Sequence, residues 1–269
     1  MTVIVGLLCS DGLVIASDSQ EGDEDLKRLD VKKVYETGHF GFKDAEVIVA
    51  GTGASAHIAR VAELIGENGF ASYPKTPRKV ADIVEDSMGQ MKARYGDDLD
   101  LELIVGVYCK SCPRDGDRPV PAIALYSVYP AEEDEKVGVA EVVTDYAATG
   151  SGGLVARYLL NRLHDESRPT ASLTVEEAIR EAVYVIEEVK KVDPYCGGPT
   201  QLLYIEKSTD GSTFRLLSKK PEEITSIVGK LSPADSDVKN QQRQIFLQAC
   251  DNRDEKPSHG APTTRAAAR

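Results

Sequence analysis

The sequence predicts an α+β fold in which two antiparallel sheets are packed between layers of helices. Apolar runs rich in β-branched residues occur at the start, in the middle and near the end of the 269-residue chain. Between them, apolar residues recur at helical spacing in two pairs of segments, near 54–67 and 76–91 and again near 153–163 and 174–191. Strand groups separated by paired helices are typical of a layered α+β domain.

The N-terminal segment is predicted to be a β-hairpin. Asp11-Gly12 separates two apolar runs, Val3–Leu8 and Leu13–Ser17, and Asp-Gly between apolar runs is the strongest short-range hairpin signal. Both alternating sets of the first run are apolar, so this strand is expected to be buried on both faces. Thr2 would be the first residue of that strand.

The remaining strands follow from short apolar runs bounded by turn residues. In the third strand, Val31, Lys33 and Tyr35 would share one face under the two-residue period. The polar connection 110–121 is expected to be a loop, and its Cys109-x-x-Cys112 lacks the second pair that a zinc site needs. Further strands are predicted at 46–50, 101–109, 122–129, 137–146, 201–206 and 214–218.

Helix starts are marked by capping signals. Thr76-Pro77 supplies an N-cap followed by proline, and Thr174 with Glu177 forms a capping box. We expect one main domain over 2–220, a C-terminal helical extension over 221–250 and a disordered tail over 251–269.

Composition narrows the class of protein. The net charge of −12 and pI near 4.9 argue against a nucleic-acid-binding protein. No apolar run reaches membrane length, and the N-terminus lacks the features of a signal peptide. Five cysteines in a long chain indicate a reducing compartment, so a cytoplasmic protein is expected. Neither a metal site nor a cofactor is predicted.

Thr2 is a candidate nucleophile. Only Met1 precedes it in this sequence, and removal of Met1 would place a free α-amine beside the threonine hydroxyl. Lys33 in Val31-Lys32-Lys33-Val34 is costly to bury unless it is paired, and Asp18 after the second strand is the natural partner.

The order of Thr2, the hairpin, Asp18 and Lys33 resembles the start of a 20S proteasome β subunit and, more broadly, the N-terminal nucleophile hydrolases. The resemblance covers about residues 2–220 and implies a four-layer αββα sandwich. It assigns Thr2 as the nucleophile, with Lys33 sharing its proton and Asp18 orienting Lys33.

Later motifs continue the resemblance. Ala50-Gly51 matches the pair whose glycine N–H stabilises the oxyanion, and Ser151 matches the serine beside the threonine amine. Asp193 matches the aspartate of an Asp-x-x-Ser-Gly-Gly pattern. Cys196 stands where that serine is expected, and a thiol is a weaker hydrogen-bond donor than a hydroxyl.

The resemblance also implies a substrate pocket. Val49 matches its floor, with Val31 and Tyr35 nearby, which favours cleavage after apolar side chains. Glu21 lies near the same rim and would shift the preference toward basic residues.

The function predicted from these residues is that of a threonine endopeptidase acting on peptides or unfolded polypeptides. The resemblance implies a homo-oligomeric ring or proteasome-type assembly, served by an ATP-dependent unfoldase. Two alternatives stay open. Cys196 and Gly153, which replace family serines, suit a catalytically silent ring subunit, and a small-amide hydrolase of the same superfamily would use the same nucleophile.

Overall fold

The computed structural model describes residues 2–22, 27–37, 44–72, 76–96, 99–114, 117–129, 139–164, 169–208 and 213–230. The chain divides into a large unit, Met1–Leu231, and a second unit, Ser232–Arg269. The second unit lies outside the described residues, and with it the part of the predicted helical extension after residue 231 and the tail predicted at 251–269. All structural statements below concern the described part of the large unit.

The first sheet contains the predicted N-terminal hairpin. Its five antiparallel strands have the order β10-β1-β2-β11-β12. Cys9 of β1 stands opposite Gly12 of β2, which confirms the turn at Asp11-Gly12. The strands are β1 Ile4–Cys9, β2 Gly12–Ser17, β10 Tyr146–Thr149, β11 Gln201–Lys207 and β12 Phe214–Ser218.

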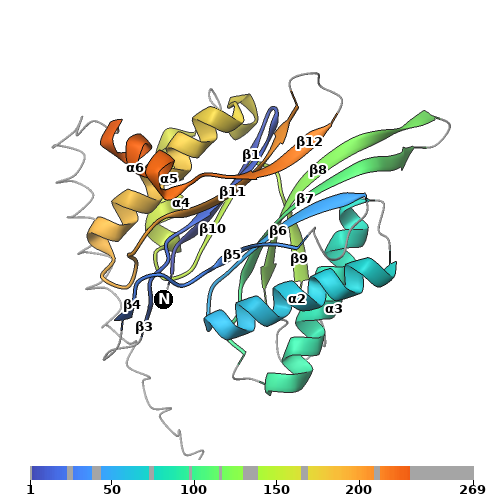
Figure 1. Ribbon diagram of the computed structural model, residues 1–269, viewed down its shortest axis with the longest axis horizontal. Coiled ribbons are helices and arrows are strands. Elements are labelled where there is room, and N and C mark those ends of the chain that lie inside the picture. Colours follow the sequence, from blue (N-terminus) through green and yellow to red (C-terminus); the bar gives the residue numbers. More distant parts are fainter. Residues whose placement is uncertain are drawn as a thin grey trace, which may run out of the picture. The chain divides into compact units, whose positions relative to one another are not determined.

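The second sheet is also antiparallel and has the order β5-β6-β7-β8-β9. Its strands are β5 Val34–Glu36, β6 Ala45–Gly51, β7 Leu103–Arg114, β8 Asp117–Tyr129 and β9 Val139–Val143. A short ribbon pairs β3 Glu21–Gly22 with β4 Lys27–Arg28, and it lies at the same end of the fold as the start of β1 (Figure 1).

The helices begin where the capping signals predict. The Thr76 side chain accepts a hydrogen bond from the Lys79 N–H, and the Thr174–Glu177 capping box is complete. The helices are α2 Ser55–Ser72, α3 Pro77–Tyr95, α4 Gly153–Leu163, α5 Val175–Val192 and α6 Pro221–Lys230, with a 3₁₀ turn η2 at Thr170–Ser172. Among the helices of the described residues, none is long and apolar enough to cross a membrane.

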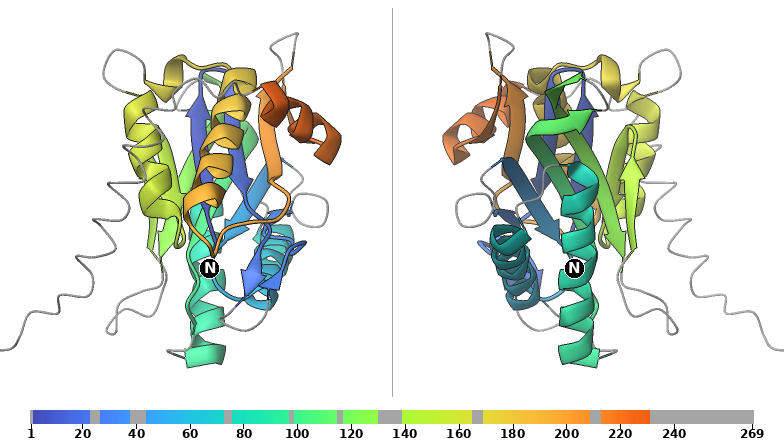
Figure 2. Two further views of the ribbon diagram at one scale, coloured as in Figure 1. Left: turned by 90° about the vertical axis from the view of Figure 1, so that its left-hand side faces the viewer. Right: turned by 90° about the vertical axis from the view of Figure 1, so that its right-hand side faces the viewer.

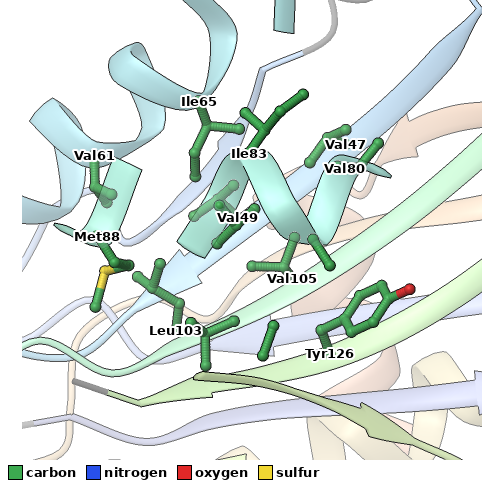
Figure 3. Close-up of a cluster of buried hydrophobic side chains, with 14 of the residues drawn as sticks. Val47, Val49, Val61, Ile65, Val80, Ile83, Met88, Leu103, Val105 and Tyr126 are labelled. Carbon is green, nitrogen blue, oxygen red and sulfur yellow. The ribbon is translucent and has the colours of Figure 1, made fainter. Parts of the chain in front are cut away.

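Three apolar clusters hold the layers together. The first fills the space between α2, α3 and the second sheet; in Figure 3, Val61 and Met88 of the helices lie over Val49 and Leu103 of the strands. The other two lie between the sheets and between the first sheet and α4–α5. Figures 1 and 2 show this order of layers. The αββα fold of the N-terminal nucleophile hydrolase type is therefore confirmed.

The side-chain alternation of β1 explains why its whole run is apolar. Val5 and Leu7 pack in the cluster under α4 and α5, whereas Ile4 packs between the sheets. Gly6 allows the sheets to approach, because a Cβ there would lie 2.8 Å from Cγ2 of Ile104. Burying both faces removes the strand from water and stabilises the sandwich by about 25 cal/mol per Å² of apolar surface.

Two strand predictions near the middle of the chain are wrong. The strand predicted at 137–146 is two strands in different sheets: β9 ends at Val143, and β10 starts at Tyr146. The loop predicted at 110–121 is the continuation of β7 and β8 into a long hairpin with register shifts after Cys109 and Cys112. Cys109 and Cys112 are buried in the cluster under α2 and α3, so this part of the hairpin belongs to the covered sheet.

The third predicted strand is shorter than expected. β5 begins at Val34, so Lys33 lies before the strand and does not share a ladder face with Tyr35. Lys33 is buried beside Thr2, whereas Tyr35 packs partly against the core under α2. The Lys33 side chain turns toward Thr2 at the start of β1, while its carbonyl still accepts the Gly51 N–H.

Candidate active site

Thr2 is buried at the start of the first sheet and is held by the turn after β10. Its backbone N–H donates to Ser151 Oγ at 3.2 Å, and its carbonyl accepts from the Gly152 N–H at 3.2 Å. Gly150 has φ of 89°, and a Cβ there would lie 2.1 Å from the Thr2 carbonyl oxygen. Glycine is thus required at this position both by its backbone conformation and by the close approach of Thr2.

Lys33 is the polar group that contacts the Thr2 side chain. Its ammonium donates to Thr2 Oγ, to the Gln20 carbonyl and to Asp18 Oδ1, the last at 2.9 Å. Lys33 is 2% exposed and Asp18 is fully buried. A lysine this deeply buried needs paired charge and hydrogen bonds, and it has both within reach of the threonine hydroxyl.

Asp18 is fixed by three segments of the chain. Its carboxylate accepts backbone N–H groups of Val3 at 3.1 Å, Gln20 at 3.1 Å and Gly197 at 3.0 Å, in addition to Lys33. These donors satisfy the lone pairs of the buried carboxylate. Asp18 is therefore held rigidly, and it fixes the position of the Lys33 ammonium.

Ser151, Cys196 and Asp193 form a chain of polar contacts leading to the Thr2 backbone nitrogen. Ser151 Oγ lies 3.8 Å from Cys196 Sγ, which donates to Asp193 Oδ2 at 3.4 Å. Burial raises the pKa of the Cys196 thiol well above its ordinary range, and the negative charges of Asp18 and Asp193 raise it further. The thiol is therefore neutral, and it can act as a hydrogen-bond donor.

The glycine turn after β6 differs from the prediction. The Gly51 N–H donates to the Lys33 carbonyl at 3.2 Å, and the Thr52 N–H donates to the Glu102 carbonyl at 2.9 Å. Gly51 is thus a ladder residue whose N–H is already bonded, which corrects its assignment as oxyanion donor.

The N–H of the next glycine, Gly53, differs from that of Gly51. Gly53 has φ of 99°, and its N–H donates no hydrogen bond within the described part of the chain. A Cβ built at Gly150 would lie 3.2 Å from Thr52 Cγ2 and 2.1 Å from the Thr2 carbonyl oxygen, so Thr52 lies close to the backbone of Thr2.

The predicted pocket residues differ in how deeply they are buried. Val49 is fully buried in the core under α2, opposite Tyr35 on the neighbouring strand. Val31 is buried, and its carbonyl accepts from Gln201 Nε2 at 2.7 Å.

Glu21 is engaged with the first turn of α2. Its carboxylate accepts from the Ser55 N–H at 2.7 Å and from the Ser55 hydroxyl at 3.0 Å. Burial acts to raise the pKa of Glu21, but the Ser55 hydrogen bonds and the charges of Arg28 and Lys33 outweigh it and lower that pKa. Glu21 thus fastens the β3–β4 ribbon to α2.

The fold is of the N-terminal nucleophile hydrolase type. No protein-family model and no curated protein matches the chain. Solved structures with the same fold include Anbu proteins. The Hyphomicrobium Gly-1 mutant of Anbu is 17% identical with a TM-score of 0.61, over 97% of this chain and 100% of that one. Anbu, the ancestral beta-subunit, from Yersinia bercovieri is 14% identical with a TM-score of 0.61, over 96% and 100%.

A third structure is the helical assembly of the Anbu complex from Pseudomonas aeruginosa, 20% identical with a TM-score of 0.58 over 97% of this chain and 98% of that one. The expected assignment to the 20S proteasome β subunits is therefore wrong, because these three structures, which cover 96–97% of this chain, are Anbu proteins. At these identities the likeness establishes the fold.

Proposed function

We propose that the chain is a threonine-type amide hydrolase that cleaves peptide bonds with Thr2 after removal of Met1. The observation that supports this most strongly is the contact of the buried Lys33 ammonium with Thr2 Oγ, backed by the 2.9 Å ion pair to Asp18. A buried cation held against a hydroxyl favours loss of the hydroxyl proton.

The reaction follows from these positions. Thr2 Oγ attacks the peptide carbonyl carbon while its proton passes to the α-amine of Thr2, directly or through Lys33 or water. The Gly53 N–H stabilises the negative oxygen of the tetrahedral intermediate. The C–N bond breaks as the leaving amine takes the proton, and an ester to Thr2 remains. Water then hydrolyses that ester and regenerates the hydroxyl.

Ser151 and Asp193 position the amine. Ser151 Oγ is within 3.2 Å of the Thr2 nitrogen, and Cys196 links Ser151 to Asp193. A free amine at Thr2 would hold one of its protons on Ser151 and present its lone pair to the hydroxyl proton. Val31, Tyr35 and Val49 are proposed to form the apolar wall beneath the substrate, and peptides with an apolar residue before the cleaved bond are the first to test.

The protein is also proposed to self-assemble. One of the structures with this fold is a helical assembly of the Anbu complex, and an oligomer of this chain is proposed by analogy. Sedimentation velocity of the purified chain tests this, with a monomer at micromolar concentration as the contrary result. Unfolded polypeptide as substrate, an unfoldase partner and a cytoplasmic location follow from the same proposal.

The decisive experiment is intact mass spectrometry after treatment with a peptide epoxyketone, a reagent that requires both the hydroxyl and the free amine of an N-terminal threonine. The expected species lacks Met1 and carries one inhibitor. Thr2→Ser should still be labelled, and Thr2→Ala should not. A protein that keeps Met1, or loses it and stays unlabelled, would contradict the proposal and favour a catalytically silent subunit. Hydrolysis of small amides but not of peptides would favour the amidohydrolase alternative.

A further inference from the structure

Glu102 joins the two turns that surround Thr2. It lies directly before β7, and its carbonyl accepts the Thr52 N–H at 2.9 Å, which continues the β6–β7 ladder by one residue. Its carboxylate accepts the hydroxyl of Thr149, the last residue of β10. One residue of the second sheet thus holds the glycine turn through its backbone and a strand of the first sheet through its side chain.

Thr149 is the residue next to the turn that binds the nucleophile. It pairs with Ile4 at the start of β1 and is followed by Gly150 and Ser151, which contact the backbone of Thr2. Thr149 is buried, so its hydroxyl depends on an internal acceptor, and a carboxylate is a strong one. A shift of Thr149 would be passed directly to Gly150 and Ser151.

We propose that Glu102 is a positioning residue that fixes the separation between the Thr2 hydroxyl and the Gly53 N–H. This rests on the proposed function of Thr2. Attack requires the nucleophile and the oxyanion donor to be fixed on either side of one carbonyl group, and a misplacement of 1 Å can cost about a hundredfold in rate. These two groups come from different sheets. Glu102 is bonded to the segment of each, so it sets their distance without itself reacting.

The kinetic test compares two substitutions at Thr149. Thr149→Val removes the hydroxyl at constant shape, and Thr149→Ser keeps it. With a fluorogenic peptide amide, Thr149→Val is expected to lower kcat about ten- to hundredfold with little change in KM, and Thr149→Ser is expected to stay near the parent. Glu102→Gln keeps an acceptor oxygen and should fall between them. Equal kcat values for the valine and serine variants would overturn the proposal.

The structural test is independent of activity. Hydrogen exchange would follow the Thr52 amide, bonded to Glu102, and the Gly152 amide, bonded to Thr2. Both are expected to exchange faster in Thr149→Val. The control is Thr170→Val, which removes another buried hydroxyl, bonded to Asp145 at 3.3 Å, and should leave both amides protected.

Faster exchange at Gly152 alone would overturn the link, because Glu102 would then not connect the two turns. A parent protein that hydrolyses no peptide and is not labelled by the epoxyketone would contradict the proposed function. The exchange data would still decide whether Glu102 couples the turns, so the two failures can be told apart.

Discussion

The backbone N–H of Gly197 donates to Oδ2 of Asp18 at 3.0 Å, although the two residues are 179 positions apart. The same carboxylate holds Lys33 through its other oxygen at 2.9 Å. The loop after α5 therefore helps to place the cation that contacts Thr2.

Substitution of Asp18 should lower the free energy of unfolding more than substitution of Lys33. Asp18→Asn leaves the Lys33 charge buried without its counter-ion and is expected to cost about 3–5 kcal/mol. Lys33→Met should cost less, because Asp18 keeps three backbone N–H donors. Urea denaturation measures both, with Asp30→Asn, an exposed aspartate, as the control. A larger loss for Lys33→Met would contradict the assignment of Asp18 as the fixed base of the pair.

Gly150→Ala should abolish activity through contact with Thr2. The alanine Cβ would lie 2.1 Å from the Thr2 carbonyl oxygen, so the nucleophile must move. Gly96→Ala is the matched control, since Gly96 also has positive φ but nothing within 4 Å of the added carbon. Each substitution should cost about 1–3 kcal/mol of backbone strain. Peptide hydrolysis distinguishes the two variants, because Gly96→Ala should stay active. An active Gly150→Ala protein would contradict the close contact between Gly150 and Thr2.

Cys196→Ser should raise activity. A hydroxyl is a better donor than a thiol, so the contacts to Ser151 and Asp193 strengthen by about 0.5–1 kcal/mol. That corresponds to about a two- to fivefold rise in kcat if it is expressed in the transition state. Cys109→Ser, at a thiol fully buried in the core under α2 and α3, should lower stability without raising kcat. A fall in kcat for Cys196→Ser would mean that the site is built around the thiol.

Cys9 should make the protein less stable in alkali. Burial, with the negative charges of Asp11 and Glu181, raises the pKa of the Cys9 thiol to about 12, whereas an unfolded thiol ionises near about 8.5. The folded state therefore holds the proton more tightly, and this stability is present below pH of about 8.5 and is lost as pH rises toward about 12.

The urea midpoint, measured at pH values of about 7.5, 9 and 10.5, should fall more steeply with rising pH for the parent than for Cys9→Val. Cys109, whose pKa burial also raises to about 12, stays in both proteins and so cancels from the comparison. Parallel curves for the parent and Cys9→Val would rule out a contribution from Cys9.

The local signals of the sequence were sufficient for the N-terminal hairpin and for the helix starts, and the family resemblance supplied the residues that meet at Thr2. The Asp-Gly hairpin and the capping box of α5 are encoded within a few residues, and the structure confirms them. The structure brings Asp18, Lys33 and Ser151 to Thr2 as the motif order predicted. Their catalytic roles stay a prediction.

The features that could not be predicted from the sequence depend on contacts between residues that are distant in the chain. The run 137–146 looks like one strand because β9 and β10 have similar apolar residues, and only their partners, β8 and β1, divide it between two sheets. Likewise, Gly51 and Gly53 are equivalent in the sequence. They differ because the distant Lys33 carbonyl accepts the Gly51 N–H, whereas the Gly53 N–H donates no hydrogen bond among the residues that the structure describes.

The contacts of Thr2 also control when reactivity can arise during synthesis. The hydroxyl needs Lys33, the backbone needs Gly150 to Gly152, and Asp18 needs Gly197. A ribosome-bound chain that has not yet exposed Gly197 carries the threonine but lacks the last group that orders its surroundings. On the proposed mechanism, a chain released early or unfolded later would be inert toward its neighbours, so the cell needs no separate inhibitor for incomplete copies.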